Sequence, residues 1–263
     1  KTAPNKMILS DFYLKDKNIY IEFWGLETDK NYLRHKEEKI KLLEGFNNKP
    51  KDILDMNVNK VSRIINSNRA FESISKFRKE KILLEIIENK KTYSEEKLEE
   101  YMKRLKMDNI CIVTYIDSKY PVRLLNIYDY PILLYVKGNI DILNNKGFSI
   151  VGCRDCTEYG AKISRRISNI LSENNLIIIS GMAKGIDTYA HLGCLDNKRE
   201  TIAVLGSGIN VIYPKENKEI YKRIIDNNGA IISEYCLDME PRKENFPMRN
   251  RIVSGMSDGV IVI

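Results

Sequence analysis

The sequence is poor in the residues that build metal centres and disulfide frameworks. It has two histidines, His35 and His191, and five cysteines among 263 residues. An odd number of cysteines argues against a disulfide framework and favours reduced thiols. Cys153 and Cys156 form a CxxC pair, but no second pair accompanies it, whereas a structural zinc takes four ligands. We therefore expect no bound metal.

Long hydrophobic stretches are also missing. No apolar run approaches the roughly 20 residues that span a bilayer. The first residues, KTAPNKMILSDF, lack the continuous apolar core of a secretory signal. We therefore expect a cytoplasmic protein with no membrane association.

Motifs for nucleotide cofactors are absent or incomplete. The chain has no GxxxxGK[ST] sequence, which excludes a P-loop ATPase. The Gly206-Ser207-Gly208 turn lacks the third glycine of a dinucleotide fingerprint, because Val211 stands at that position. No cofactor is therefore expected. The net charge of +7 raises the question of a polyanionic partner, but a lysine- and asparagine-rich composition gives the same charge without one.

Two parts of different character follow one another along the chain. Residues 7–109 place apolar residues at spacings of three and four, which predicts a small helical domain that ends in a charged helix over Tyr93–Met107. Beyond it, short Val/Ile/Leu runs predict strands that alternate with helices. The expected strands are Ile110–Ile116, Ile132–Val136, Phe148–Val151, Leu176–Ser180, Thr201–Leu205, Ala230–Ser233 and Gly259–Ile263. The expected helices are Tyr159–Ser172, Asp187–Leu195, Lys215–Asp226 and Met248–Met256.

This alternation, with short connections, predicts an α/β domain over residues 110–263. Nearly continuous apolar strands are typical of a parallel sheet that is buried on both faces, so we expect a Rossmann-like, doubly wound and mostly parallel sheet. Because the chain stops inside the last expected strand, we expect this sheet to be truncated at the C-terminus.

Four segments at the expected carboxyl ends of the strands carry glycines or cations. Ligands of such sheets bind at these ends, where glycine lets the backbone approach and a helix N-terminus offers free N–H groups to an anion. Arg154 and Lys184 follow two of the turns, and Pro247 at a first helical position would place Arg249 and Arg251 in the first turn of a helix. Together the segments predict a groove for a phosphate chain. They are Val151–Arg154, Ser180–Asp187, Gly206–Gly208 and Phe246–Arg251.

Each of these features also has a purely structural interpretation. Strand–glycine–helix turns are common in α/β proteins. Asp187 and His191, four residues apart, either cap and orient a helix end or act as an acid–base pair. Phe246 either stacks on a base or packs in the core. Tyr213-Pro214 is most simply a turn.

The order and spacing of these motifs resemble the DNA-processing protein A (DprA/Smf) family. The family's Gly-Ser-Arg turn corresponds to Gly152-Cys153-Arg154. The resemblance extends from about Ile110 to the end of the chain, and residues 7–109 loosely resemble the family's SAM-like domain. The matching strings are YPVRLLNIYDYPILLYVKGN (Tyr120–Asn139), ISGMAKGIDTYAHLGCL (Ile179–Leu195), TIAVLGSGINVIYPKEN (Thr201–Asn217), GAIISEY (Gly229–Tyr235) and FPMRNRIVSGMSDGVIVI (Phe246–Ile263).

The resemblance implies a binder of single-stranded DNA that is not an enzyme. It implies that the protein protects the strand and loads the RecA recombinase onto it, as in natural transformation, and that the full-length protein is a homodimer. We expect the DNA-binding residues to be Gly152, Arg154, Ser180, Gly181, Lys184, Gly185, Asp187, His191, Gly206, Gly208, Phe246, Arg249, Asn250 and Arg251.

Two other functions remain open from the residues. A nucleotide-processing hydrolase of the phosphoribohydrolase type shares glycine-rich strand ends, but its PGGxGTxxE motif does not occur here. A small-nucleotide sensor would use Asp187, His191 and the Gly206–Gly208 turn to hold one ligand. A strand binder gains affinity over several nucleotides, whereas a sensor saturates with one.

Overall fold

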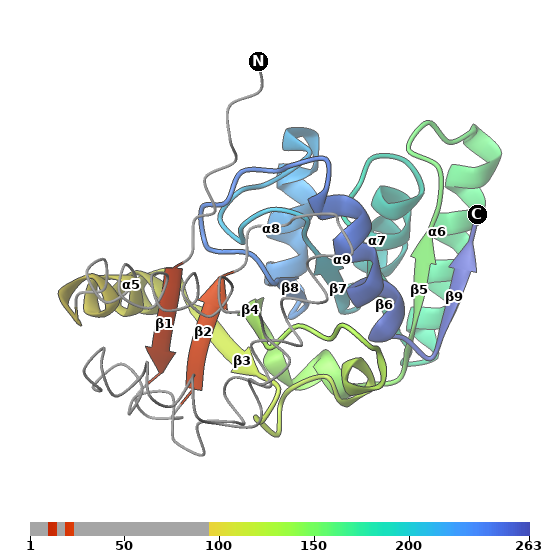
Figure 1. The fold of residues 1–263 in the computed structure, drawn as a ribbon. Helices are drawn as coiled ribbons and strands as arrows, with labels where there is room; N and C mark the ends of the chain where they lie inside the picture. The colour runs from red at the N-terminus through yellow and green to blue at the C-terminus, as the bar shows by residue number, and fades with distance from the viewer. Residues whose placement is uncertain (1–9, 15–18, 24–94) are drawn as a thin grey trace, which may run out of the picture. The chain divides into compact units, whose positions relative to one another are not determined.

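The computed structural model describes residues 10–14, 19–23 and 95–263 (Figure 1). Residue contacts divide the chain into two units, Lys1–Lys103 and Arg104–Ile263. The expected helices between residues 24 and 94 lie outside the described residues.

The first unit contains a pair of strands where we expected helix. Strands β1 (Ser10–Leu14) and β2 (Ile19–Phe23) are antiparallel, with Ser10 opposite Phe23. The helical prediction is therefore wrong for these residues. Their sequences, SDFYL and IYIEF, are rich in aromatic and β-branched residues, which favour strands. The expected charged helix does form, as α5 (Glu95–Met107).

The second unit is built on a seven-stranded sheet in the order β3-β4-β8-β7-β6-β5-β9. Strands β5 to β9 are mutually parallel, while β4 pairs antiparallel with both β3 and β8. This mostly parallel arrangement confirms the predicted Rossmann-like class. The strands are β3 (Ile110–Thr114), β4 (Leu133–Gly138), β5 (Gly147–Val151), β6 (Ile177–Ser180), β7 (Thr201–Val204), β8 (Ala230–Ser233) and β9 (Gly259–Val262).

The chain reverses its direction across the sheet at β5. It proceeds from β5 through β6 and β7 to β8, and α9 then carries it back over the sheet to β9, on the other side of β5. Figure 1 shows α9 on one face of the sheet and α6, α7 and α8 on the other. Such a reversal creates a crevice at the carboxyl ends of the strands. The helices are α6 (Glu158–Glu173), α7 (Ile186–Asp196), α8 (Lys218–Asp226) and α9 (Asn245–Gly255), with 3-10 turns η2 (Val122–Asn126), η3 (Ile140–Asn144) and η4 (Lys215–Asn217).

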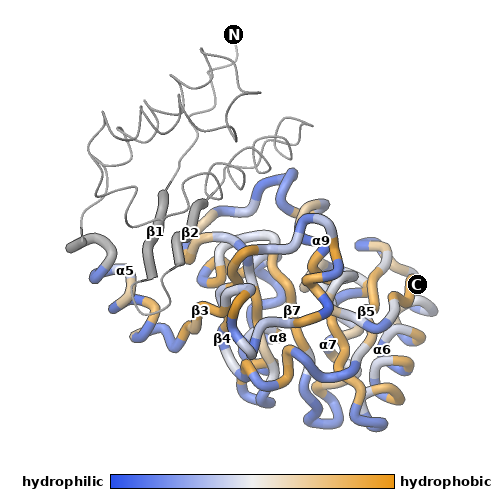
Figure 2. The backbone as a smooth tube through the Cα atoms, turned by 60° about the horizontal axis from the view of Figure 1, so that its bottom comes forward, coloured by the Kyte–Doolittle hydropathy of each residue, from blue (hydrophilic) through white to orange (hydrophobic). Residues whose placement is uncertain are grey.

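The strands are apolar because both of their faces are covered. On β6, Ile177 and Ile179 pack in the core layer that contains Val253 of α9, while Ile178 packs in the opposite layer with Ile186 of α7. Figure 2 shows hydrophobic strands within a more hydrophilic periphery. Burial on both faces explains the continuous apolar runs in the sequence.

Helix α9 starts earlier than the sequence suggested. It begins at Asn245, so Pro247 occupies its third position, where a missing N–H costs no helical hydrogen bond. Arg249 and Arg251 therefore lie in the second turn, which corrects their expected place in the first. Among the described residues, no helix is long and apolar enough to cross a membrane.

Candidate functional site

A cleft of about 380 Å³ opens where the parallel strands end. Its walls come from the end of β5, the turn before α7, the helix α9 and Val260 of β9. The crevice expected from the reversal at β5 is thus present. Seven of the predicted site residues line it: Gly152, Arg154, Asp187, Phe246, Arg249, Asn250 and Arg251.

Arg154 and Phe246, which line the cleft, form a cluster with the ring of Tyr213, which lies outside its lining. The Arg154 guanidinium carbon is 5.4 Å from the centroid of the Phe246 ring, a distance that permits a cation–π interaction. The Tyr213 ring lies on Phe246 with the centroids 5.5 Å apart and the planes tilted by 40°. Tyr213 is 44% exposed and Phe246 is half-buried. The structure thus places Phe246 at the surface of the cleft and not in the core.

Tyr213 is the member of this group that the sequence reasoning missed. We interpreted Tyr213-Pro214 only as a turn. The available signal was an aromatic residue in the connection that follows a strand-end glycine motif, because such connections converge on the ligand-binding edge of the sheet. We name Arg154, Phe246 and Tyr213 the stacking platform.

Arg154 is an exposed cation of the cleft. Within the described part of the chain, no carboxylate pairs with its side chain, which lies over Phe246. The turn that carries it packs closely on Gly185, where a Cβ atom would collide with the carbonyl oxygens of Cys153 and Arg154. Gly185 also has a φ of +76°, a conformation that glycine adopts without strain. Glycine at this position therefore lets the two turns meet.

Asp187 binds backbone N–H groups of the turn between β6 and α7. Its carboxylate accepts hydrogen bonds from Gly181 N at 3.1 Å and from Ala183 N at 3.4 Å. Burial raises the pKa of Asp187, while the Arg249 charge and these N–H groups act in the opposite direction. The chain thus supplies its own anion to this turn. At the start of α7, Ile186 N donates to Cys153 O at 3.2 Å, so this N–H is not free for an external anion as we expected.

Arg249 borders the cleft, but the residue is only 4% exposed. Its Nη1 donates to the carbonyl oxygens of Gly181, at 2.5 Å, and Val204, so that it joins the ends of β6 and β7. A Cβ atom at position 181 would lie 2.5 Å from its Nη2, so glycine makes room for the side chain. Burial lowers the pKa of Arg249, and Asp187 opposes this effect. We expected a free cation in the groove, whereas the structure makes Arg249 an internal brace.

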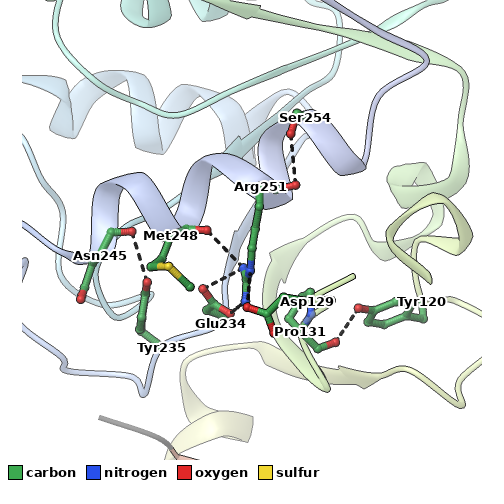
Figure 3. A network of polar contacts seen from close by, with 9 residues as sticks. All are labelled: Tyr120, Asp129, Pro131, Glu234, Tyr235, Asn245, Met248, Arg251 and Ser254. Atoms are coloured by element: carbon green, nitrogen blue, oxygen red, sulfur yellow. Dashed lines mark hydrogen bonds and ion pairs between the residues drawn. The ribbon is translucent and has the colours of Figure 1, made fainter. Parts of the chain in front are cut away.

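Arg251 is likewise neutralised from within (Figure 3). Its Nη2 and Nη1 bind the Glu234 carboxylate at 2.6 and 3.1 Å, and its Nε binds Asp129 at 3.2 Å. Burial lowers the pKa of Arg251, but the two carboxylates raise it overall above its usual range. Burial raises the pKa of the Glu234 carboxyl, whereas the charge of Arg251 lowers it. Arg251 thus forms part of the wall, and its charge is already compensated.

Lys184 forms an ion pair outside the cleft. Its Nζ lies 2.5 Å from Glu216 in an exposed ion pair, and Lys184 does not line the cleft. The hydrogen bond from Lys184 to Glu216 raises the pKa of Lys184. The cation is accessible, although a bound phosphate would have to compete with the Glu216 carboxylate.

The remaining predicted residues support the site from inside the fold. Ser180 is buried and donates to Ile150 O at 2.6 Å. A Cβ atom at Gly206 would lie 2.8 Å from the Phe246 ring, and one at Gly208 would collide with Cys236 O. These positions therefore hold neighbouring segments close together and do not face the cleft.

His191 is fully buried and does not reach the cleft. Its Nδ1 lies 2.9 Å from Thr201 Oγ1, which itself donates to Ile178 O, so the proton of this contact belongs to Nδ1. Burial lowers the pKa of His191 to about 3. Asp187 binds backbone N–H groups and His191 binds Thr201, so the structure favours the orienting role over an acid–base pair.

These features define a Rossmann-like binding domain with a cation and an aromatic platform at the carboxyl edge of its sheet. Within the described ranges, no cluster of three or more His, Cys, Asp or Glu side chains could hold a metal. The model of the family "DNA recombination-mediator protein A" matches residues 111–263. The chain belongs to this family.

Relatives and solved structures agree with this assignment. The chain is 47% identical over 147 residues to DNA processing protein DprA of Streptococcus pneumoniae, covering 56% of this chain and 51% of the relative. It is 40% identical over 144 residues to Protein Smf of Escherichia coli, covering 55% and 38%. The chain therefore spans about half, or less, of the length of these curated relatives.

Two solved structures of the family share the fold. The X-ray structure of DprA from Streptococcus pneumoniae superposes with a TM-score of 0.66 at 33% identity, over 86% of this chain and 71% of that one. A structure of DprA from Helicobacter pylori, described as giving insight into its single-stranded DNA binding mode, has a TM-score of 0.51 at 30% identity. The match covers 58% of this chain and 68% of that one.

Proposed function

We propose that this chain binds single-stranded DNA at the cleft and acts as a recombination mediator. The observation that carries the proposal is the stacking platform, which joins an exposed cation to aromatic rings. Single-strand binders combine these groups, because cations neutralise the phosphates while bases stack on aromatic faces. Family membership and the Helicobacter pylori relative support the same function.

In this proposal the strand is held without any covalent chemistry. Arg154 binds a phosphate, and a base stacks on the rings of Phe246 and Tyr213. Asn250 contributes an exposed amide beside them. Asp187 and Arg249 fix the turns that present these groups. Because Arg154 contacts phosphate and an aromatic ring can stack on any base, we expect little sequence preference. We infer that the chain is not an enzyme.

We also propose for this protein the cellular role that its resemblance to the family implies. The protein protects the strand and loads RecA onto it in the cytoplasm, as in natural transformation, and the full-length protein is a homodimer. We also propose an N-terminal domain over residues 7–109 and a DNA-binding domain over residues 110–263; the division of contacts after Lys103 supports two units. A strand-exchange assay with RecA, on single-stranded DNA to which the full-length protein has been added, tests the loading role. A full-length protein that fails to stimulate the assay would contradict it.

Selectivity for single strands tests the proposed binding mode. Stacking on Phe246 and Tyr213 requires an accessible base face, which a duplex does not offer. We therefore expect labelled single-stranded oligonucleotides to raise fluorescence anisotropy at lower protein concentration than duplexes of equal length. Equal affinity for both would show a non-selective basic surface and contradict the platform.

Removing the carboxylate that pairs with Lys184 should strengthen binding. In Glu216→Gln, Lys184 becomes free to bind phosphate, so we expect an affinity increase of about threefold, in keeping with an exposed ion pair. The slope of log affinity against log salt should become steeper by roughly 0.7, the contribution of one further phosphate contact. Glu219→Gln, an exposed neighbour on α8, is the matched control. Equal effects in both variants would assign the gain to net charge alone.

A further inference from the structure

The connection from β5 to α6 carries two thiols, one on each side of Arg154. Cys153 is exposed, Cys156 is half-buried, and neither forms a disulfide. The segment lacks regular secondary structure until Thr157, whose Oγ1 caps α6 by accepting from Gly160 N at 3.1 Å. Cys-x-x-Cys is the spacing of redox-active dithiols. The proposed DNA contact is thus flanked by a potential thiol pair.

The sulfur of Cys153 already lies beside the backbone of Cys156. It is 3.5 Å from the carbonyl oxygen of Asp155, which belongs to the peptide group that joins Asp155 to Cys156. Cys156 packs on the apolar cluster that includes Ile150 and Ile178. The exposed thiol therefore meets an oxidant first, and Cys156 is the residue that follows the carbonyl group contacted by its sulfur.

We propose that Cys153 and Cys156 are an oxidation site that forms a reversible disulfide and weakens DNA binding. With hydrogen peroxide as the oxidant, the Cys153 thiol loses its proton, and the thiolate attacks one peroxide oxygen. The S–O bond forms as the O–O bond breaks, which gives a sulfenic acid, and the departing hydroxide takes up the proton from the thiol and leaves as water. The Cys156 thiol then displaces the sulfenic oxygen as a second water, and the S–S bond forms. Two thiols are oxidised and one peroxide is reduced, and a dithiol reductant reverses the reaction.

The disulfide would enclose Arg154 in the ring that it closes. In the reduced loop, Cys153 O accepts a hydrogen bond from Ile186 N at 3.2 Å, and this contact holds the turn against α7. Drawing Cys156 out of its apolar packing and onto Cys153 changes the bend at Arg154 and Asp155. The Arg154 guanidinium would then leave its place 5.4 Å from the Phe246 centroid. The part of this inference that concerns DNA binding rests on the proposed function.

The bond itself is tested by peptide mapping of the chain after exposure to hydrogen peroxide. We expect a peptide that contains both Cys153 and Cys156 and has lost the mass of two hydrogen atoms. The loss should be absent from Cys156→Ser and unchanged in Cys111→Ser, which removes an exposed thiol on β3. A chain that is oxidised only at other cysteines, or only to higher acids of Cys153, would overturn the proposal.

The consequence is tested by anisotropy with a labelled single-stranded oligonucleotide. We expect the oxidised chain to bind about tenfold more weakly, the effect of losing roughly one charged contact. Dithiothreitol should restore the affinity, and peroxide should leave Cys156→Ser unaffected. A mapped disulfide with unchanged affinity would refute the switch. If the reduced chain does not bind, the proposed function fails, and the peptide map still decides whether the oxidation site exists.

Discussion

Replacing Arg154 with alanine is expected to weaken single-stranded DNA binding by about 10- to 100-fold, since a hydrogen bond to a charged group contributes about 1.5–3 kcal/mol. Arg154 is an exposed cation of the cleft, and its guanidinium lies over Phe246. The variant loses both the phosphate contact and the ordering of the ring. Anisotropy titrations at two salt concentrations measure the loss. The salt slope should also decrease in magnitude by roughly 0.7.

Two further substitutions separate a specific contact from a general charge effect. Arg154→Lys keeps the charge but lacks the planar group that stacks on Phe246, so an intermediate affinity is expected. Arg166→Ala removes an exposed arginine from α6 and serves as the matched control. Near wild-type binding by Arg154→Ala, or an equal loss in Arg166→Ala, would contradict the assignment of the platform.

Replacing Arg249 with methionine should destabilise the fold by about 3–5 kcal/mol, the usual consequence of leaving a buried charge without its countercharge. The substitution leaves the buried Asp187 without its countercharge and leaves the carbonyls of Gly181 and Val204 without their donor. Urea unfolding at neutral pH measures the loss of unfolding free energy. Although Arg249 borders the cleft, we therefore expect its main effect to be on stability.

The pH dependence identifies Asp187 as the origin of this loss. Burial already raises the pKa of Asp187, and removing Arg249 takes away the largest opposing effect. A carboxyl group whose folded pKa is raised stabilises the fold below its unfolded pKa of about 3.9, and this stability is lost as pH rises through the folded pKa. The deficit of Arg249→Met relative to wild type should therefore shrink on acidification.

A double variant is the control for this interpretation. Arg249→Met combined with Asp187→Asn removes the orphaned charge, so it should recover part of the lost stability at neutral pH. The amide oxygen introduced by the second substitution can still accept hydrogen bonds from the turn. A deficit that is constant with pH, or a double variant as unstable as the single one, would mean that the uncompensated charge of Asp187 is not the cause.

The sequence predicted the sheet well because its strands are buried on both faces. Apolar runs such as that of β6, IIIS over Ile177–Ser180, predict a buried parallel strand. The helical prediction was wrong at Ser10–Leu14 and Ile19–Phe23. There we applied the helical interpretation of residues 7–109 to two short segments that are rich in aromatic and β-branched residues.

The sequence predicted where the cleft lies, but it predicted the interactions of the cleft's side chains only in part. The glycine-rich strand ends located the cleft, because the topology brings them to one edge of the sheet. The partners of the cations were not predictable, since Arg251 binds Asp129, which is 122 residues away in the chain, and the charge of Arg249 acts on Asp187 of α7. Two of the expected groove cations consequently became internal, and Arg154 remained exposed.

The most direct test of the account is a length series of labelled single-stranded oligonucleotides, with a mononucleotide as competitor. A strand that stacks on Phe246 and Tyr213 and extends across Arg154 toward Lys184 gains contacts as it lengthens. We predict that affinity rises over several nucleotides and that the mononucleotide competes poorly. An affinity that is already maximal with one nucleotide would contradict the account and identify the cleft as a small-nucleotide site.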